Sequence, residues 1–256
     1  GRDTVETRSQ GFYSLAFFFS RFLFINTMKL NQLLHYLNEQ AGLYEDIEEI
    51  ANYPEGFNIN EFKDQPSFAA KVRYLKRFGL DKLGAGSSRA VFVADPTTVI
   101  KVAKNKKGLE QNRIEAEVSS HNSDGAPISL VKDSDPDNFW IEAERARKAK
   151  PTDFKNIVGF PMEAVMKTVR ERIDDNTGQA SYNHYFYLKD RELYKQISET
   201  DFVSDLVELI VSHDLGRGDI QRISSWGVVN RNGSDHLVLV DYGLDMDLFN
   251  RLYKRW

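Results

Sequence analysis

One stretch of the chain decides the fold: residues 83–101, which read LGAGSSRAVFVADPTTVIK. Gly84 and Gly86 let the backbone turn tightly and approach a ligand without a side chain in between. Apolar residues on either side of Asp95-Pro96 predict two strands, because valine and isoleucine favour extended backbone and Asp-Pro favours a turn. The stretch therefore predicts a strand, a glycine turn and two further strands.

The glycine turn and the strands after it carry the chemistry of an anion site. Ser87 and Ser88 add backbone and hydroxyl donors to the turn, which suits a phosphate group. Lys101 is the unusual residue of the last strand, since a strand bordered by valines normally gives its inward positions to apolar side chains. A lysine at this position either points to water or meets an anion.

The composition limits the classes of protein to which the chain can belong. The chain has 256 residues, enough for one large or two small domains, and its 41% hydrophobic content is enough for a buried core. A net charge of −4 gives no bulk attraction to DNA, RNA or anionic lipid. Without cysteine the chain forms no disulfide and no thiolate zinc site, and its five histidines lack metal-ligand spacing.

The first 27 residues contain an apolar run that a charged residue interrupts. Arg21 breaks the aromatic run of residues 12–25, whereas a transmembrane helix needs about 20 uninterrupted apolar residues. No small-residue cleavage site follows the run, so it does not read as a signal peptide. We expect Met28 to be the natural start, with residues 1–27 not native. A partner-binding or membrane-surface segment stays open as the alternative.

The following residues, up to residue 79, predict a helical extension. Apolar side chains form a stripe at helical spacing in residues 30–37 and again in residues 67–75. The acidic run at residues 45–49 is interpreted as a solvated helix face. No catalytic grouping is recognisable here, so we interpret the extension as a brace or as a docking element for a protein partner.

A helix is predicted over residues 109–118, after a polar turn that follows Lys101. A helix packed across the glycine turn presents Glu115 to the strand, where the carboxylate keeps Lys101 ionised and directed at a phosphate. Glu117 lies on another face, since two residues turn a helix by about 200°. Two more strands are expected at residues 128–131 and 139–143, followed by a polar hinge.

At this point the sequence resembles the small lobe of the protein-kinase-like fold, of the kind that bacteriophages and bacteria encode. Residues 84–91, GAGSSRAV, are similar to the glycine-rich loop Gly-x-Gly-x-x-Gly-x-Val, with Arg89 in place of the third glycine. Val99-Ile100-Lys101 resembles the Val-Ala-Ile-Lys strand. The resemblance implies that Arg89 and the turn contact phosphate, and that backbone groups of Glu144 and Ala146 recognise the base.

The second half resembles the same family at the end of a predicted hairpin. Asp241-Tyr242-Gly243 is similar to the Asp-Phe-Gly motif, which implies that Asp241 holds Mg²⁺. Two alignments of the catalytic loop compete. In the preferred one, Asp219 is the catalytic aspartate and Ser224 or Ser225 is the second metal ligand. In the other, Asp214 is the catalytic aspartate and Asp219 takes the second metal position.

The resemblance implies an α+β, two-lobed fold, with a five-stranded antiparallel N-lobe sheet, one N-lobe helix and a short, mainly helical C-lobe. We expect an extension over residues 1–79, the N-lobe and hinge over 80–150, and a reduced C-lobe over 151–256. The first functional hypothesis is an ATP- and Mg²⁺-dependent phosphotransferase of unknown acceptor. The second is a catalytically impaired nucleotide-binding or interaction protein, and either is expected in a cytoplasm, or in a virion if a bacteriophage encodes it.

Overall fold

The computed structural model describes residues 53–178 and 190–252, apart from the side chain of Asp219. The predictions for residues 1–52 and 179–189, including a start at Met28 and the acidic helix face at residues 45–49, lie outside these ranges.

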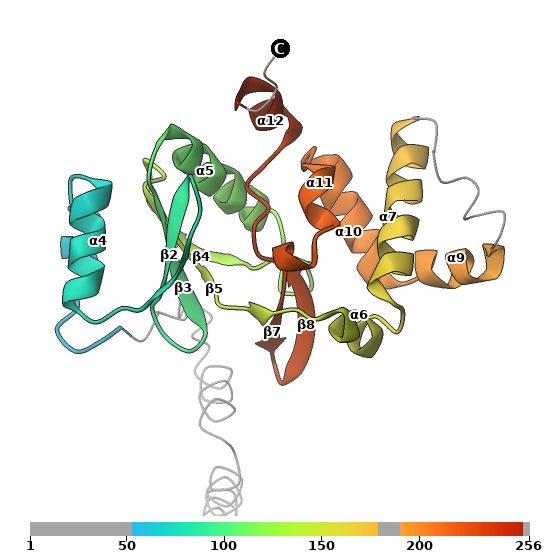
Figure 1. Ribbon diagram of the computed structural model, residues 1–256, viewed down its shortest axis with the longest axis horizontal. Helices are drawn as coiled ribbons and strands as arrows, with labels where there is room; N and C mark the ends of the chain where they lie inside the picture. The colour runs from blue at the N-terminus through green and yellow to red at the C-terminus, as the bar shows by residue number, and fades with distance from the viewer. Residues whose placement is uncertain (1–52, 179–189, 253–256) are drawn as a thin grey trace, which may run out of the picture. The chain divides into compact units, whose positions relative to one another are not determined.

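The first half of the described chain builds a five-stranded antiparallel sheet (Figure 1). Across the sheet the strands are β1 (Lys82–Ala85), β2 (Arg89–Val93), β3 (Thr98–Ala103), β5 (Trp140–Glu144) and β4 (Val131–Ser134). Lys101 of the central strand β3 pairs with Val91 on one side and Ile141 on the other. The three strands predicted within residues 83–101 are therefore present, and the expected five-stranded sheet is confirmed.

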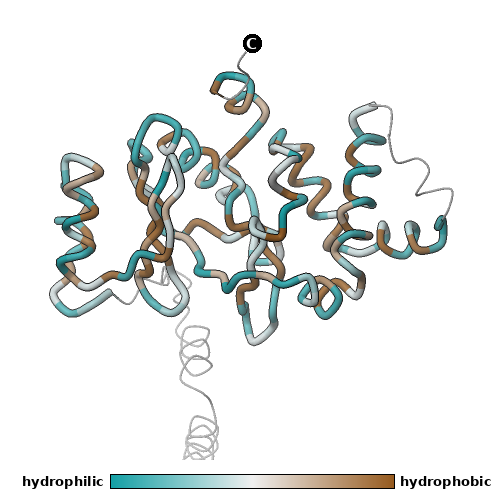
Figure 2. The backbone as a smooth tube through the Cα atoms, in the orientation of Figure 1, coloured by the Kyte–Doolittle hydropathy of each residue, from teal (hydrophilic) through white to brown (hydrophobic). Residues whose placement is uncertain are grey.

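Helices cover both faces of this sheet, which explains why all six residues of β3 are buried. On one face α3 (Ile59–Lys63) and α4 (Phe68–Arg77) share a hydrophobic core with Ile100 and Val102. Helix α4 is amphipathic, and hydrophilic and hydrophobic colours alternate along its turns in Figure 2. Because side chains alternate along a strand, Lys101 points to the opposite face, which α5 (Lys106–Ser120) covers.

The second half is mainly helical and also contains a small three-stranded sheet of β6 (Arg147–Lys148), β7 (Trp226–Arg231) and β8 (Ser234–Leu239). Its longer helices are α7 (Met162–Thr177), α9 (Arg191–Ser198) and α10 (Asp201–Ser212). Shorter helices are α6 (Pro151–Ile157), α11 (Arg217–Ile220), the 3-10 turn η1 (Ile223–Ser225) and α12 (Met246–Leu252). One hydrophobic core joins these elements to the α5 residues Ile114 and Val118.

Two boundaries in the first half differ from the predicted ones. The fourth strand begins at Val131 rather than Ile128, because Ile128 forms a parallel bridge with Leu239 of β8. Helix α5 begins at Lys106, inside the predicted polar turn, because the Asn105 side chain caps it by accepting a hydrogen bond from the Gly108 N–H.

The C-terminal end of helix α7 takes in residues 174–177, although their sequence Asp-Asp-Asn-Thr is typical of a loop. The helix ends at Gly178, whose φ of +65° is the left-handed conformation that glycine adopts without strain. Asp174 is held in the last turn by an ion pair with Arg217, at 2.8 Å.

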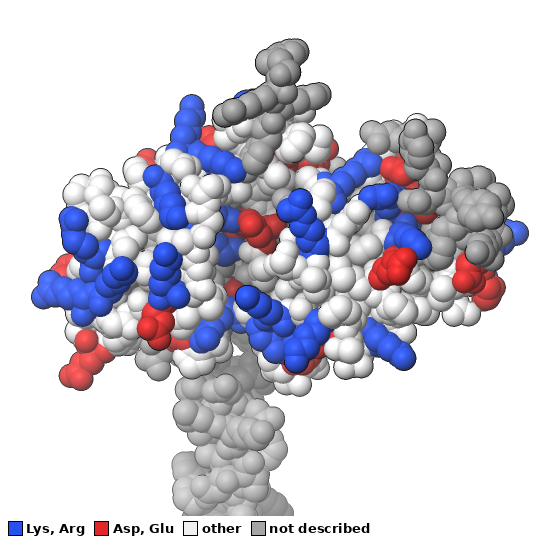
Figure 3. All heavy atoms as spheres, viewed as in Figure 1, with Lys and Arg blue, Asp and Glu red and all other residues white. Residues whose placement is uncertain are grey.

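No helix among the described residues is long and apolar enough to cross a membrane. On the face seen in Figure 3, basic side chains are scattered among uncharged ones, with acidic side chains between them, and do not form one continuous basic patch.

Candidate functional site

The structure brings Lys101 and Glu115 together. The Lys101 Nζ donates to Glu115 Oε2 at 2.6 Å, and Lys101 and Glu115 are only 5% and 0% exposed. The same Nζ donates to the backbone carbonyl of Val240 at 2.8 Å. The lysine of the apolar strand therefore meets a carboxylate rather than water, and it also contacts the segment that carries Asp241.

Arg89 joins this pair to the second half of the chain. Its Nη2 donates to Glu115 Oε1 at 2.7 Å and to Asp241 Oδ1 at 2.6 Å, while its Nη1 donates to Asn112 Oδ1 at 3.3 Å. The Arg89 side chain is buried, whereas the Asp241 side chain is 62% exposed. Lys101, Glu115, Arg89 and Asp241 thus form one chain of ion pairs, called the four-charge cluster below.

The charges in this cluster stabilise one another. Burial raises the pKa of the Glu115 carboxyl, but the cations Arg89 and Lys101 outweigh burial and hold that pKa below its usual value. Burial also lowers the pKa of the Arg89 guanidinium, and Glu115 and Asp241 together raise it above its usual value. Glu115 is therefore a carboxylate and Arg89 a cation at any physiological pH.

The Asp241-Tyr242-Gly243 segment docks closely against α5. The Tyr242 hydroxyl donates to the Ser129 carbonyl at 2.7 Å, and burial, followed by the charge of Glu115, raises its pKa well above the usual value. A Cβ on Gly243 would lie 2.5 Å from the Gln111 carbonyl oxygen, so only glycine permits this approach to the helix. Packing of the neighbouring residues therefore holds Asp241 beside Arg89.

The turn between β1 and β2 is tied to the start of α5. The Ser88 carbonyl accepts from the Lys104 N–H at 2.8 Å, and the Ser87 carbonyl accepts from the Asn105 side chain at 3.1 Å. Ser88 is buried and its hydroxyl donates to the Gln111 side chain, so the predicted phosphate-binding hydroxyl is turned inward. Ser87 remains at the exposed surface of the turn.

The predicted role of Gly84 and Gly86 is partly different in the structure. Gly84 lies within β1, and neither glycine has a positive φ, so the turn does not depend on left-handed backbone at these positions. A Cβ at either position would meet nothing within 4 Å. The space above both residues is open, which leaves room for a ligand to approach the backbone.

The candidate catalytic loop lies between α10 and β7. Asp219 belongs to helix α11, but its side chain lies outside the described part of the structure. Ser225 is buried, and its carbonyl accepts from the Val240 N–H at 2.9 Å, which puts Ser224 and Ser225 across the hairpin from Asp241. Asp214 has a φ of +46°, and its carbonyl accepts from the Met246 N–H at 2.9 Å. These contacts are compatible with both alignments of the catalytic loop.

Glu144 and Ala146, the hinge residues predicted to recognise the base, lie in surroundings that differ from each other. The Glu144 N–H donates to the Leu130 carbonyl at 2.9 Å, and the Glu144 carbonyl accepts from the Ser129 hydroxyl at 2.9 Å. The backbone of Glu144 is thus already hydrogen-bonded within the protein. Ala146 packs against β7, where a Cβ on Gly227 would lie 2.4 Å from the Ala146 Cβ.

The predicted metal ligands can be compared with what Mg²⁺ requires, which is near-octahedral oxygen coordination, usually by one or two carboxylates together with water and substrate phosphates. Asp241 is paired with Arg89, and Ser224 and Ser225 offer only neutral hydroxyls. Among the described residues, no group of three or more Asp, Glu or His side chains is placed to hold a metal ion. Of the predicted ligands that the structure describes, only Asp241 offers a carboxylate, and Arg89 already occupies it, so this set does not fit Mg²⁺.

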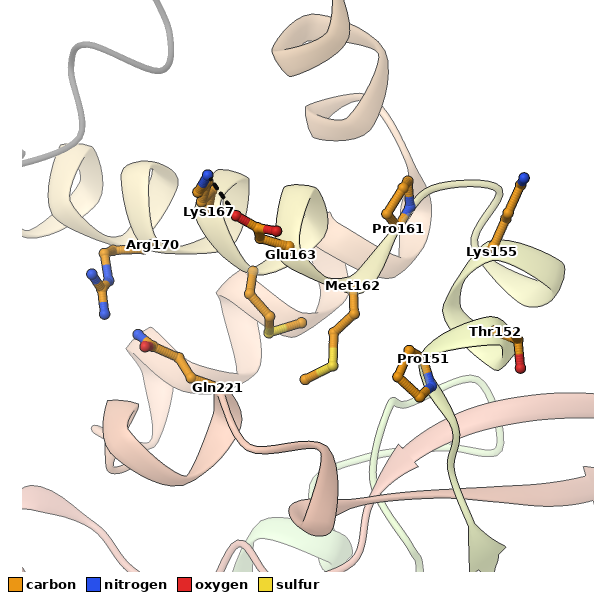
Figure 4. A pocket seen from close by; sticks show the side chains of 10 residues that line it. Pro151, Thr152, Lys155, Pro161, Met162, Glu163, Lys167, Arg170 and Gln221 are labelled. Carbon is orange, nitrogen blue, oxygen red and sulfur yellow. Dashed lines mark ion pairs between the residues drawn. The ribbon is translucent and has the colours of Figure 1, made fainter.

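A cavity of about 680 Å³ lies beside the candidate catalytic loop, between α6, α7 and the residue that follows α11 (Figure 4). Met162 points into it, Arg170 and Gln221 face one end of it, and Glu163 and Lys167 form an ion pair of 2.9 Å on α7. The volume lies within the range of about 300–1,000 Å³ that small-molecule sites occupy. The remaining lining residues are Pro151, Thr152, Lys155, Pro161 and Met166.

No family model and no curated protein matches this chain. Among solved structures the chain is similar to a ternary complex of streptomycin, ATP and APH(2")-IIa, at 14% identity and a TM-score of 0.29. The match covers 67% of this chain and 70% of that chain. A TM-score this low carries no weight for function, which has to come from the chain's own geometry.

Two functional or structural contacts were not predicted from the sequence. The first is the pairing of Arg89 with both carboxylates. The second is Arg231 of β7, which is buried and donates to both oxygens of the Glu144 carboxylate, at 2.9 and 2.6 Å. An arginine in a buried strand was the available signal in both cases, since a buried guanidinium requires an anionic partner.

Proposed function

We propose that the chain is a kinase-like protein that binds ATP beside the four-charge cluster. The observation that carries this proposal is the buried ion pair between Lys101 and Glu115, on a central strand and on the helix that covers it. Lys101 supplies a cation for the phosphates, and the ion pair with Glu115 orients that cation. The open backbone at Gly84 and Gly86 supports the approach of a phosphate from the turn side.

Phosphoryl transfer is the reaction we propose first. Asp219, from α11, positions an acceptor hydroxyl, and the cavity lined by Met162, Arg170 and Gln221 holds the acceptor. Proximity supports this assignment, because Gln221 directly follows the helix that carries Asp219.

A non-catalytic nucleotide-binding or interaction protein is the second candidate. The ion pair between Arg89 and Asp241 favours it, because the carboxylate expected to serve catalysis is already bound to a cation of the protein. Both candidates share the nucleotide site, and they differ only in whether phosphate leaves the nucleotide.

Thermal unfolding with and without millimolar ATP tests the shared part of the proposal, because a ligand that binds only the folded state raises the unfolding temperature. We expect a rise for the natural chain and a smaller one for Lys101→Met, with Lys63→Met, at the half-exposed ion pair with Asp133, as the control. An equal rise in both variants would contradict the site assignment.

Phosphate release or transfer from ATP separates the two candidates. In a phosphotransferase, Met162→Trp fills the cavity and reduces transfer to an acceptor, while ATP still raises the unfolding temperature as in the natural chain. Binding of ATP without any release or transfer selects the non-catalytic candidate.

A further inference from the structure

We infer that the Arg89 guanidinium takes the place of the metal ion in this site, so that the nucleotide binds without a divalent cation. The inference rests on the proposed binding of ATP. It concerns the cation that accompanies the nucleotide phosphates, and not whether a nucleotide binds.

The contacts of Arg89 put a permanent positive charge beside the carboxylate that the family resemblance assigns to a metal. The Arg89 Nη2 lies 2.6 Å from Asp241 Oδ1. A metal on that carboxylate oxygen would have to displace the guanidinium, which is buried and anchored by Glu115 and Asn112 as well. Arginine keeps its charge at any physiological pH, so this cation is always present.

The charge balance of the four-charge cluster also supports the replacement of a metal ion by Arg89. Two cations, Lys101 and Arg89, face two carboxylates, Glu115 and Asp241, and the cluster is neutral as it stands. A divalent ion on Asp241 Oδ1 would add two positive charges beside the buried guanidinium, at a carboxylate that this guanidinium already neutralises. Within the protein, the two carboxylates of the cluster are thus already matched by its own two cations.

The position of Arg89 in the chain explains how one residue produces this arrangement. Arg89 is the first residue of β2, directly after the turn, where the resemblance places a third glycine. A glycine there would leave Asp241 open to a cation and Glu115 with Lys101 alone. The arginine instead gives the site two fixed cations, and guanidinium groups bind phosphate oxygens well because their N–H donors form a planar fork.

Isothermal titration of the full chain with ATP, in excess EDTA and in excess Mg²⁺, tests the inference. We expect the natural chain to bind ATP with dissociation constants that agree within about threefold in the two conditions. Arg89→Gly should weaken binding in EDTA by at least about tenfold and recover part of that loss when Mg²⁺ is added. Arg89→Lys, which keeps the charge, should lose less, and Arg113→Ala, at a half-exposed arginine of α5, should behave as the natural chain.

Asp241→Asn gives an independent test that does not depend on a stable Arg89 variant. If Arg89 replaces the metal, this change leaves binding in EDTA unchanged or tighter, since it frees the guanidinium from one partner. Binding by the natural chain only in Mg²⁺, together with its loss in Asp241→Asn, would overturn the inference and restore Asp241 as a metal ligand. Absence of ATP binding in both conditions would instead remove the proposed nucleotide function itself.

Discussion

Glu115 and Asp241 accept hydrogen bonds from the same nitrogen of Arg89, at 2.7 and 2.6 Å, but their surroundings differ. The Glu115 side chain is 0% exposed and the Asp241 side chain is 62% exposed. A buried carboxylate must be fully paired, whereas an exposed one keeps much of its hydration whether or not it is paired. Ion pairs of nearly equal length therefore correspond to different roles. Glu115 holds the site together, and Asp241 is the member of the cluster that a ligand can reach.

The largest expected effect is that of Glu115→Ala on stability. The change leaves Arg89 without its buried anion and Lys101 without its only carboxylate partner among the described residues. Breaking a buried pair in this way costs about 3–5 kcal/mol, because an unpaired charge stays in the interior. Denaturation with urea measures the loss as a change in the free energy of unfolding.

Glu117→Ala is the matched control for that measurement. Glu117 lies on the same helix, its side chain is 56% exposed, and it pairs with Arg113 one turn away. We expect this change to cost less than about 1 kcal/mol, as is usual for exposed pairs. Equal losses for Glu115→Ala and Glu117→Ala would show that the cluster does not stabilise the fold.

The two carboxylates also differ in how far the sequence predicts them. The pairing of Lys101 with Glu115 follows from a local pattern, since an apolar strand with one cation and the helix after it pack together. The pairing of Arg89 with Asp241 joins residues far apart in the chain and depends on how the hairpin docks on α5. That docking depends on the contacts of Tyr242 and Gly243, which periodicity does not encode.

The distinction between local patterns and long-range contacts also explains which other features the sequence predicts. The three strands within residues 83–101 were predicted because turn chemistry and β-branched residues act locally. The fourth strand was misplaced because Ile128 pairs with β8, a long-range contact. The inward turn of the Ser88 hydroxyl was not predictable either, since its acceptor is Gln111 on a helix that packs over the turn. The predicted role of Asp219 stays a prediction.

Gly243→Ala tests whether docking on α5 places Asp241. The new Cβ would lie 2.5 Å from the Gln111 carbonyl oxygen and 2.9 Å from its Cα, so the segment or the helix must move. Overpacking of this kind costs about 1–3 kcal/mol. Gly86→Ala is the control, because its Cβ would meet nothing within 4 Å, and thermal unfolding compares the two variants. Equal stability of both would mean that the approach of Gly243 to α5 can relax without cost.

Acid titration tests how much the buried carboxylate of Glu115 contributes to stability. Because the pKa of the Glu115 carboxyl is below its usual value in the folded protein, Glu115 contributes stability above about pH 4.5, its usual pKa. That contribution disappears as the pH falls through the lowered pKa, when the carboxyl becomes protonated. The free energy of unfolding of Glu115→Gln should therefore fall less steeply with acid than that of the natural chain. Identical slopes would contradict a lowered pKa at Glu115.

The smallest effect is expected for Asp241→Asn. Arg89 keeps Glu115 and Asn112 as partners, and the exposed carboxylate that is lost was largely hydrated. The free energy of unfolding should therefore change by less than about 1 kcal/mol, although the ion pair is as short as that of Glu115. Urea denaturation of Asp241→Asn and of Glu115→Gln compares their free energies of unfolding. The two variants are matched, because each changes a carboxylate to an amide. A loss at Asp241 as large as that at Glu115 would mean that Asp241 holds the two halves of the site together, and that its exposure does not leave it free to serve a ligand.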